Sequence, residues 1–340
     1  MTRFHPLLTR LGGRPLAIAP RALDGLLAAG PLLDAGPRLD ARPRLGPHQA
    51  MFAARDAPPG ASHAVTDAGI AVVPILGPLV TRSDWLTSFL GASGYGEIAA
   101  AVEAALADPS ARAVLLELDS PGGEVGGLFD LVDRLVSLRE AAGKPLWAVA
   151  HESALSAAYA IASVADRLYV TRTAEVGSVG VVAIHVDESV ADRDAGQNWT
   201  LIHAGARKID GNPHEPLSDG AHTAIRADVE ALYGDLVSLV ANNRRMTPES
   251  VRATEAAIYR GARGVTAGFA DQIGTFGDAI RDLARFIGPR SSAVLRTGAR
   301  SAAPMPATRM PATRMPATPI LQSSRRETIM TTDTVPDPST

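Results

Sequence analysis

The sequence predicts an α/β fold in which parallel strands alternate with helices, and three observations lead to this prediction. Short apolar runs, often β-branched, recur along the chain from Gly69 onward. Each is followed by an alanine-rich or amphipathic segment long enough for a helix. The 340 residues are 46% apolar, which is enough for one large domain with extensions or for two modest domains.

The predicted elements follow one another from residue 69 to residue 288. Strands are expected where four to eight apolar residues run together, and helices where alanine or 3.6-residue periodicity dominates. In order, we expect a strand and turn at 69–80, a helix at 95–108, a strand at 113–119, a helix at 127–142, a strand at 145–150, a small-residue helix at 154–165, strands at 167–171 and 179–186, a long helix around 231–245, and a turn, short strand and closing helix within 265–288.

The two ends of the chain differ in composition from this middle part. Residues 1–66 are rich in Pro, Gly, Ala and Arg, with a short helical pattern near 22–29, and we interpret them as an N-terminal arm. Residues 289–340 contain the near-exact repeat MPATR MPATR MPATP and bury too little apolar surface to offset their ordering entropy, which predicts a disordered tail. The main folded domain is expected over residues 67–288.

Composition also argues against several classes of function. A net charge of -3 offers no excess of basic residues to neutralise nucleic acid or an anionic membrane surface, so we expect no nucleic acid partner. The chain has no cysteine, which excludes disulfides, thiolate metal sites and a cysteine nucleophile, and we expect neither metal nor cofactor. No apolar run reaches the roughly 18 residues of a membrane span, and prolines interrupt the start, so we expect no anchor or signal peptide.

Lysine is rare in this chain, since only Lys144 and Lys208 are lysines among 33 basic residues. Arginine does not release its proton because its pKa exceeds about 12, so a basic residue that must lose a proton has to be one of these two. Lys144 precedes Pro145 at the entrance to a predicted strand, where a solvent-facing charge is the ordinary interpretation. We assign it no role.

Small-residue motifs follow the predicted strands, at the sheet edge where α/β proteins place their ligand crevices. In DSPGG, Gly122 and Gly123 free backbone N–H groups to point at an anion, as an oxyanion hole requires, although a plain strand-to-helix turn fits as well. In HESALSAAY, Ser156 opens a small-residue helix with its hydroxyl accessible to substrate. A helix N-cap is the alternative, and Ser153 fits that role better than Ser156.

Two further motifs complete the set. Gly177-Ser178-Val179-Gly180 lies about one strand beyond Ser156, and GARKIDG carries Lys208. Singly, each is compatible with an ordinary turn and a solvated charge. Together with DSPGG and S-x-x-Y, however, GSVGV and GxxK resemble the S49 peptidases, the signal peptide peptidase A family, and especially its phage branch of head maturation proteases. The resemblance covers roughly residues 67–285.

The resemblance implies roles for individual residues: Ser156 as nucleophile, Lys208 as general base, Ser178 as the hydroxyl that orients the lysine, and Gly122 and Gly123 as the oxyanion-forming turn. It also implies a crotonase-like, Clp-type fold of repeated ββα units and ring-like homo-oligomers with catalytic groups shared between subunits. The implied activity is cleavage of scaffold, capsid or portal proteins during phage head assembly, in the bacterial cytoplasm or within the procapsid. One departure is Ala157-Ala158, where the signal peptide branch often has Gly-Gly.

A serine–lysine dyad makes a demand that can be tested. A lysine accepts a proton only when neutral, so its usual pKa of about 10.4 must fall to near 7 or 8, which corresponds to about 4 kcal/mol of destabilisation of the charged form. Burial in an apolar cleft supplies such a destabilisation. We therefore expect Lys208 to be largely buried in the assembled enzyme, without a close carboxylate, and Asp210 to point away from it.

Four alternatives remain open. A Clp-type protease uses a histidine base one strand beyond the serine, and His185 is the candidate, although it is better interpreted as a strand residue. An acyl-CoA hydratase or isomerase on the same fold relies on acidic residues and does not need Ser156 or Lys208. The other two alternatives are a signal-peptide-degrading peptidase of a bacterial host and a non-catalytic assembly protein.

Overall fold

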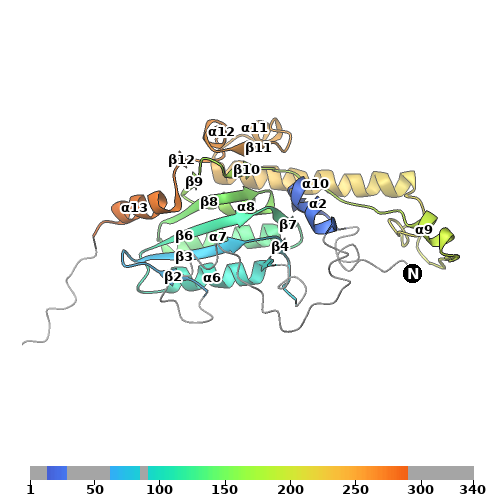
Figure 1. Ribbon diagram of the computed structural model, residues 1–340, viewed down its shortest axis with the longest axis horizontal. Helices are drawn as coiled ribbons and strands as arrows, with labels where there is room; N and C mark the ends of the chain where they lie inside the picture. Colours follow the sequence, from blue (N-terminus) through green and yellow to red (C-terminus); the bar gives the residue numbers. More distant parts are fainter. Residues whose placement is uncertain (1–13, 29–61, 85–90, 290–340) are drawn as a thin grey trace, which may run out of the picture. The chain divides into compact units, whose positions relative to one another are not determined.

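The computed structural model describes residues 14–28, 62–84 and 91–289 (Figure 1). Residues 1–13 and 29–61 of the predicted arm, and residues 290–340 of the predicted tail, lie outside the described residues. The predicted boundaries of the three regions therefore stay predictions.

A mostly parallel sheet forms the centre of the described structure, which confirms the predicted α/β class. Its strands lie in the order β11-β10-β8-β6-β3-β2, and β9 and β12 continue beside β8. β3, β6 and β8 pair in parallel and are almost completely buried, as expected for strands covered on both faces. The strand bounds are β2 Ala64–Val65, β3 Ile70–Leu76, β6 Ala113–Ser120, β8 Leu146–Leu155, β9 Arg167–Val170, β10 Glu175–Gly177, β11 Ile258–Arg260 and β12 Gln272–Ile273.

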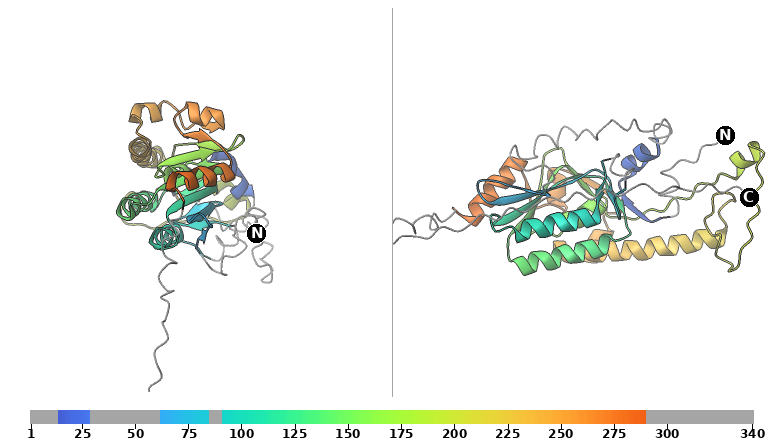
Figure 2. Two further views of the ribbon diagram at one scale, coloured as in Figure 1. Left: turned by 90° about the vertical axis from the view of Figure 1, so that its left-hand side faces the viewer. Right: turned by 90° about the horizontal axis from the view of Figure 1, so that it is seen from below.

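Helices cover both faces of this sheet (Figures 1 and 2). Because side chains alternate along a strand, Val114, Leu116 and Leu118 of β6 join a core cluster with one set of helices, whereas Leu115 packs toward α13 on the other side. The first set comprises α6 Tyr95–Ala107, α7 Leu128–Ala142, α8 Ala157–Ala162 and the C-terminal part of α10 Asp219–Arg244, and the other face is covered by α13 Phe276–Ile287.

A second, small sheet joins segments that are far apart in the sequence. Its order is β1-β7-β4-β5, in which β7 carries both glycines of the DSPGG motif. The first strand comes from the N-terminal arm, so this arm packs directly against the motif. The bounds are β1 Leu16–Ile18, β4 Leu79–Val80, β5 Ser93–Gly94 and β7 Gly122–Glu124.

Two predicted elements differ from the structure. The helix expected at 154–165 begins only at Ala157, because β8 continues to Leu155, where it pairs with β6 and β10. The strand expected at 179–186 is wrong: apart from one bridge between Val182 and Leu16, this segment pairs with no strand among the described residues.

The remaining helices are short and lie outside the central layers. The short N-terminal helix falls where the arm was predicted to be helical. None of the helices within residues 14–28, 62–84 and 91–289 is both long enough and apolar enough to span a membrane. The bounds are α2 Pro20–Ala28, α9 Ser189–Asp194, α11 Pro248–Arg252 and α12 Ala262–Thr266.

Candidate active site

Ser156 lies in a sharp turn between β8 and α8, at the carboxyl edge of the central sheet. Its backbone has φ 54° and ψ -115°, a combination that type II′ turns normally give to glycine because a Cβ strains it. The residue is 1% exposed, and its N–H donates to the Gly177 carbonyl at 2.8 Å. A serine on a strained strand-to-helix turn is the arrangement that presents the nucleophile in α/β-hydrolases.

Among the described helices, one other N-cap residue has the same backbone conformation. Gly261 precedes α12 with φ 50° and ψ -119°, and there the chain has glycine. At the equivalent position before α8 it has serine, whose side chain caps no N–H of the helix. The Oγ of Ser156 instead donates to the Gly180 carbonyl at 3.3 Å. A structural cap therefore does not account for Ser156, and strain of this kind is typical of functional sites.

The two glycines of the DSPGG motif lie beside Ser156. A Cβ added to Gly122, whose φ is +95°, would be 3.0 Å from Ser156 Cβ and 2.9 Å from the Leu155 carbonyl oxygen. Only glycine therefore fits there. Gly123 lies between β1 and β4, and an added Cβ would be 1.8 Å from the Leu79 carbonyl oxygen. The motif is thus a close approach of backbone to the serine rather than a simple turn.

Ser178 occupies the corresponding position on the neighbouring strand. Gly177 of β10 pairs in parallel with Leu155 of β8, so Ser178 and Ser156 are the next residues on two strands that lie about 4.8 Å apart. Ser178 is 5% exposed and also has a positive φ, 55°. Ser156, Ser178 and both glycines therefore meet at one edge of the sheet, as the motif order suggests.

Lys208 is not part of this cluster within one chain. It is exposed and lies in the segment between α9 and α10, which is remote from α8 in Figure 1. Contacts with residues 185–188 hold this segment: the Glu188 N–H donates to the Pro213 carbonyl at 2.7 Å. At about 3.3 Å per residue, the extended chain from Gly180 to residue 185 spans on the order of 16 Å, which separates Lys208 from Ser156.

The surroundings of Lys208 contain no ion pair for its ammonium group within the described ranges of the chain. The carboxylate of Asp210 pairs with Arg207, with 3.2 Å between Oδ2 and Nε. Lys144, the other lysine, donates to the Asp108 carbonyl at 2.8 Å, before the start of β8, whereas Ser156 follows the end of that strand.

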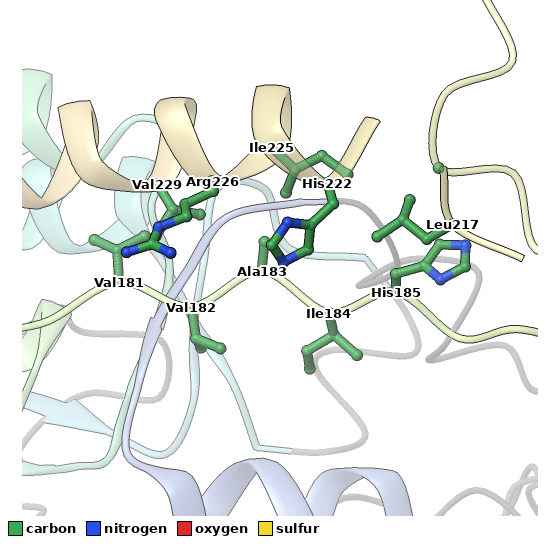
Figure 3. A pocket seen from close by; sticks show the side chains of 11 residues that line it. Val181, Val182, Ala183, Ile184, His185, Leu217, His222, Ile225, Arg226 and Val229 are labelled. Carbon is green, nitrogen blue, oxygen red and sulfur yellow. The ribbon is translucent and has the colours of Figure 1, made fainter. Parts of the chain in front are cut away.

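His185 also lies away from the serine. Its Nε2 is 3.0 Å from the Asn212 carbonyl oxygen, at the far end of the extended segment that begins after Gly180. Figure 3 shows this segment running beneath α10, with Val181 and Ala183 pointing toward the helix and Val182 and Ile184 pointing to the opposite side. Among the residues that the structure describes, no hydrogen bond or ion pair joins His185 to Ser156.

A cavity of about 400 Å³ lies between this segment and α10 (Figure 3). Its lining is mainly apolar, with His222 and Arg226 as the polar side chains of α10. The extended segment therefore separates the cavity under α10 from β1, which lies on its other side.

Sequence reasoning missed one part of the site, strand β1. Its three residues pair with β7, directly beside Gly122 and Gly123. The short apolar run between Pro15 and Pro20 was the available signal, but three residues are too few to indicate a strand.

Comparison with known proteins connects this geometry to a family. Residues 139–287 match the model for "Peptidase family S49". The chain is 39% identical over 216 residues, 64% of its length, to the head-tail preconnector protein GP5 of Enterobacteria phage P21, and covers 43% of that protein. It is 37% identical over 212 residues, 62% of its length, to the capsid assembly protease C of Escherichia phage lambda, of which it covers 48%. A putative signal peptide peptidase SppA of Enterococcus faecium is 27% identical over 177 residues, 52% of the chain and 51% of that protein. The chain thus spans about half the length of these curated relatives.

Proposed function

We propose that the chain, whose residues 139–287 match the model for peptidase family S49, is a serine endopeptidase of that family and that its nucleophile is Ser156. The observation that carries the proposal is the strained turn at Ser156, buried against the backbone of Gly122. A serine in that conformation costs free energy and does not cap the helix, whereas a nucleophile needs this close contact with an oxyanion-binding backbone.

The proposed reaction is acyl transfer to serine followed by hydrolysis. The Ser156 Oγ attacks the carbonyl carbon of the scissile peptide bond while its proton passes to Lys208 Nζ. Backbone N–H groups of Gly122 and Gly123 are proposed to stabilise the negative oxygen, for which the Gly122 N–H must leave Ser120 Oγ, to which it donates at 3.2 Å in the structure. The proton then moves from Lys208 to the leaving amine, and water hydrolyses the ester through the same base, releasing the acid and the serine hydroxyl. Ser178 is proposed to orient Lys208.

We further propose that Lys208 serves the Ser156 of a neighbouring subunit. Its segment and the adjacent α9 expose three large apolar side chains: Ile202 is 96% exposed, Trp199 47% and Val190, in α9, 59%. A second subunit covering them would also remove Lys208 from water, which favours the neutral amine. This assembly is the ring-like homo-oligomer that a Clp-type, crotonase-like fold implies.

The proposed substrates are scaffold, capsid or portal proteins of a phage or prophage head, processed in the host cytoplasm or in the procapsid. Support comes from the two phage relatives, one of which is a capsid assembly protease by name. We also propose that residues 67–288 are the catalytic domain, with residues 1–66 as an arm and 289–340 as a disordered tail.

Subunit mixing tests the nucleophile, the base and their sharing together. Ser156→Ala and Lys208→Arg proteins should each fail to cleave an unfolded protein substrate, followed by intact mass. Dissociated and reassembled as a one-to-one mixture, they should regain about one quarter of wild-type activity, because a quarter of random neighbour pairs unite both native groups. If the mixture regains no activity, Lys208 does not serve the Ser156 of a neighbouring subunit. Normal cleavage by Lys208→Arg with a dead His185→Ala would instead make histidine the base, and a wild-type protein that never cleaves would leave an assembly protein.

A further inference from the structure

Strand β1 lies between the two backbone segments that border Ser156. On one side it pairs antiparallel with β7, in the register Leu16 to Glu124, Ala17 to Gly123 and Ile18 to Gly122. On the other side Leu16 and Val182 exchange two hydrogen bonds of 2.8 Å and 2.9 Å. Residues 16–18 are therefore held as an extended strand between β7 and the segment at Val182, next to the nucleophile.

The register places one carbonyl group of the arm at the reaction centre. Hydrogen bonds join Val125 N–H to Pro15 O at 3.2 Å and Ala19 N–H to Pro121 O at 2.8 Å. Because hydrogen-bonded pairs alternate in an antiparallel ladder, the Ala17–Gly123 pair between them is also a hydrogen-bonded position. The Ala17 carbonyl thus faces the backbone of Gly123.

The same carbonyl lies next to the serine. A Cβ on Gly122 would be 2.3 Å from the Ala17 oxygen and 3.0 Å from Ser156 Cβ, so these two groups are neighbours across one small gap. The strand is also well buried: Ala17 is 0% exposed, and Leu16 and Ile18 pack with Leu23 in a small cluster of their own. Such a strand leaves no room for a second peptide.

We propose that residues 15–19 are a built-in substrate mimic that occupies the peptide-binding groove and must leave it before a substrate binds. This proposal rests on the proposed function of Ser156. Main-chain hydrogen bonds of the strand pairing supply affinity without requiring a particular side-chain sequence, as in other cases of β-strand addition. Pro20 and α2 end the extended chain directly after Ala19, so the mimic is limited to residues 15–19.

A peptide-binding measurement in full-length protein that lacks the nucleophile tests this idea apart from catalysis. The probe is a fluorescent peptide with the sequence of residues 14–20, RPLAIAP, followed by anisotropy with the Ser156→Ala protein. Ala17→Asp, added to that protein, places a carboxylate at a fully buried position of β1 and should release the strand. The apparent affinity of the protein for the peptide should then rise by about tenfold or more. The reason is that only molecules whose groove is empty can bind, so the apparent affinity is proportional to the fraction of such molecules.

The matched control is Arg21→Ala, which changes an exposed residue of α2 two residues beyond the end of the mimic. It should bind the peptide as weakly as the parent. Ile18→Ser is the second variant, which loosens the arm without adding charge and keeps the test valid if Ala17→Asp does not fold. Equal affinity in all folded variants would overturn the mimic even if the wild-type enzyme cleaves proteins. Increased binding in the released variants, with no cleavage by the wild-type protein, would instead retain the groove and refute the peptidase.

Discussion

The strained backbone of Ser156 predicts that glycine stabilises the fold more than alanine at this position. With φ 54° and ψ -115°, a residue bearing a Cβ costs on the order of 1–3 kcal/mol. Glycine removes this cost but adds about 0.5–1 kcal/mol of chain entropy to the unfolded state. The Ser156→Gly protein should therefore exceed Ser156→Ala in free energy of unfolding by about 1 kcal/mol, or roughly 2–4 °C in Tm.

Urea unfolding of the two variants measures the difference directly, and both lack the nucleophile, so self-digestion does not interfere. Since both also lack the Oγ, its hydrogen bond to Gly180 cancels in the comparison. The control is Ala100→Gly in the Ser156→Ala protein. Ala100 is an exposed residue within α6, where the same change should destabilise by about 0.5–1 kcal/mol.

The reasoning is refuted if glycine destabilises at both positions by similar amounts. That result would mean that Ser156 is relaxed in solution, and the argument for its role from backbone strain would fail. Opposite signs at the two positions would establish that the fold holds residue 156 in a conformation suited to glycine.

Three further predictions concern the site and its support. Gly122→Ala should lower kcat/KM for peptide cleavage by about 10²–10³, because its Cβ would lie 3.0 Å from that of Ser156, whereas exposed Gly96→Ala meets nothing within 4 Å and should retain activity. Burial alone would raise the pKa of Asp271, but hydrogen bonds and the charge of Arg244 lower this pKa in the folded protein. The stabilising contribution of Asp271 is therefore present above its unfolded pKa of about 3.9 and is lost as pH falls through the lower folded pKa. Urea unfolding between pH 6 and pH 3 should therefore show a shallower loss of stability for Asp271→Asn, and an unchanged slope would contradict the shift. Tyr159→Phe should cost about 1–3 kcal/mol in urea unfolding, because the buried hydroxyl donates to a main-chain carbonyl at 2.9 Å that would lose its partner, and a cost near zero would show that water replaces it.

The sequence predicted the central layers well because their signals are local. β3, β6 and α7 coincide with their predicted ranges to within a few residues. Long apolar runs and helical periodicity can be recognised in the sequence without knowing which strands or helices pack against them. The end of β8 was missed because His151-Glu152-Ser153 is polar. The strand continues beyond them because Ser153, Ala154 and Leu155 pair with β10, and Ala154 also pairs with Ser120 of β6.

Non-local pairing explains the other failures. Residues 179–186 have the apolar character of a strand, yet their neighbours over most of their length are α10 and a cavity rather than another strand. β1 is the converse case: three residues with almost no signal become a strand because β7 and Val182 offer hydrogen bonds on both sides. The glycine and serine motifs were found because each follows a buried strand whose carboxyl end fixes its position.

The position of Lys208 has a consequence for regulation when it is combined with the occupied groove. If the base comes from a neighbouring subunit and the arm fills the groove of its own subunit, an isolated chain lacks both the base and access to substrate. Assembly supplies the first, and only displacement of residues 15–19 supplies the second. Such an enzyme remains inactive at low concentration even when folded, and specific activity should fall on dilution below the dissociation constant of the oligomer. Released variants such as Ala17→Asp should keep this concentration dependence, because freeing the groove does not bring Lys208 to Ser156.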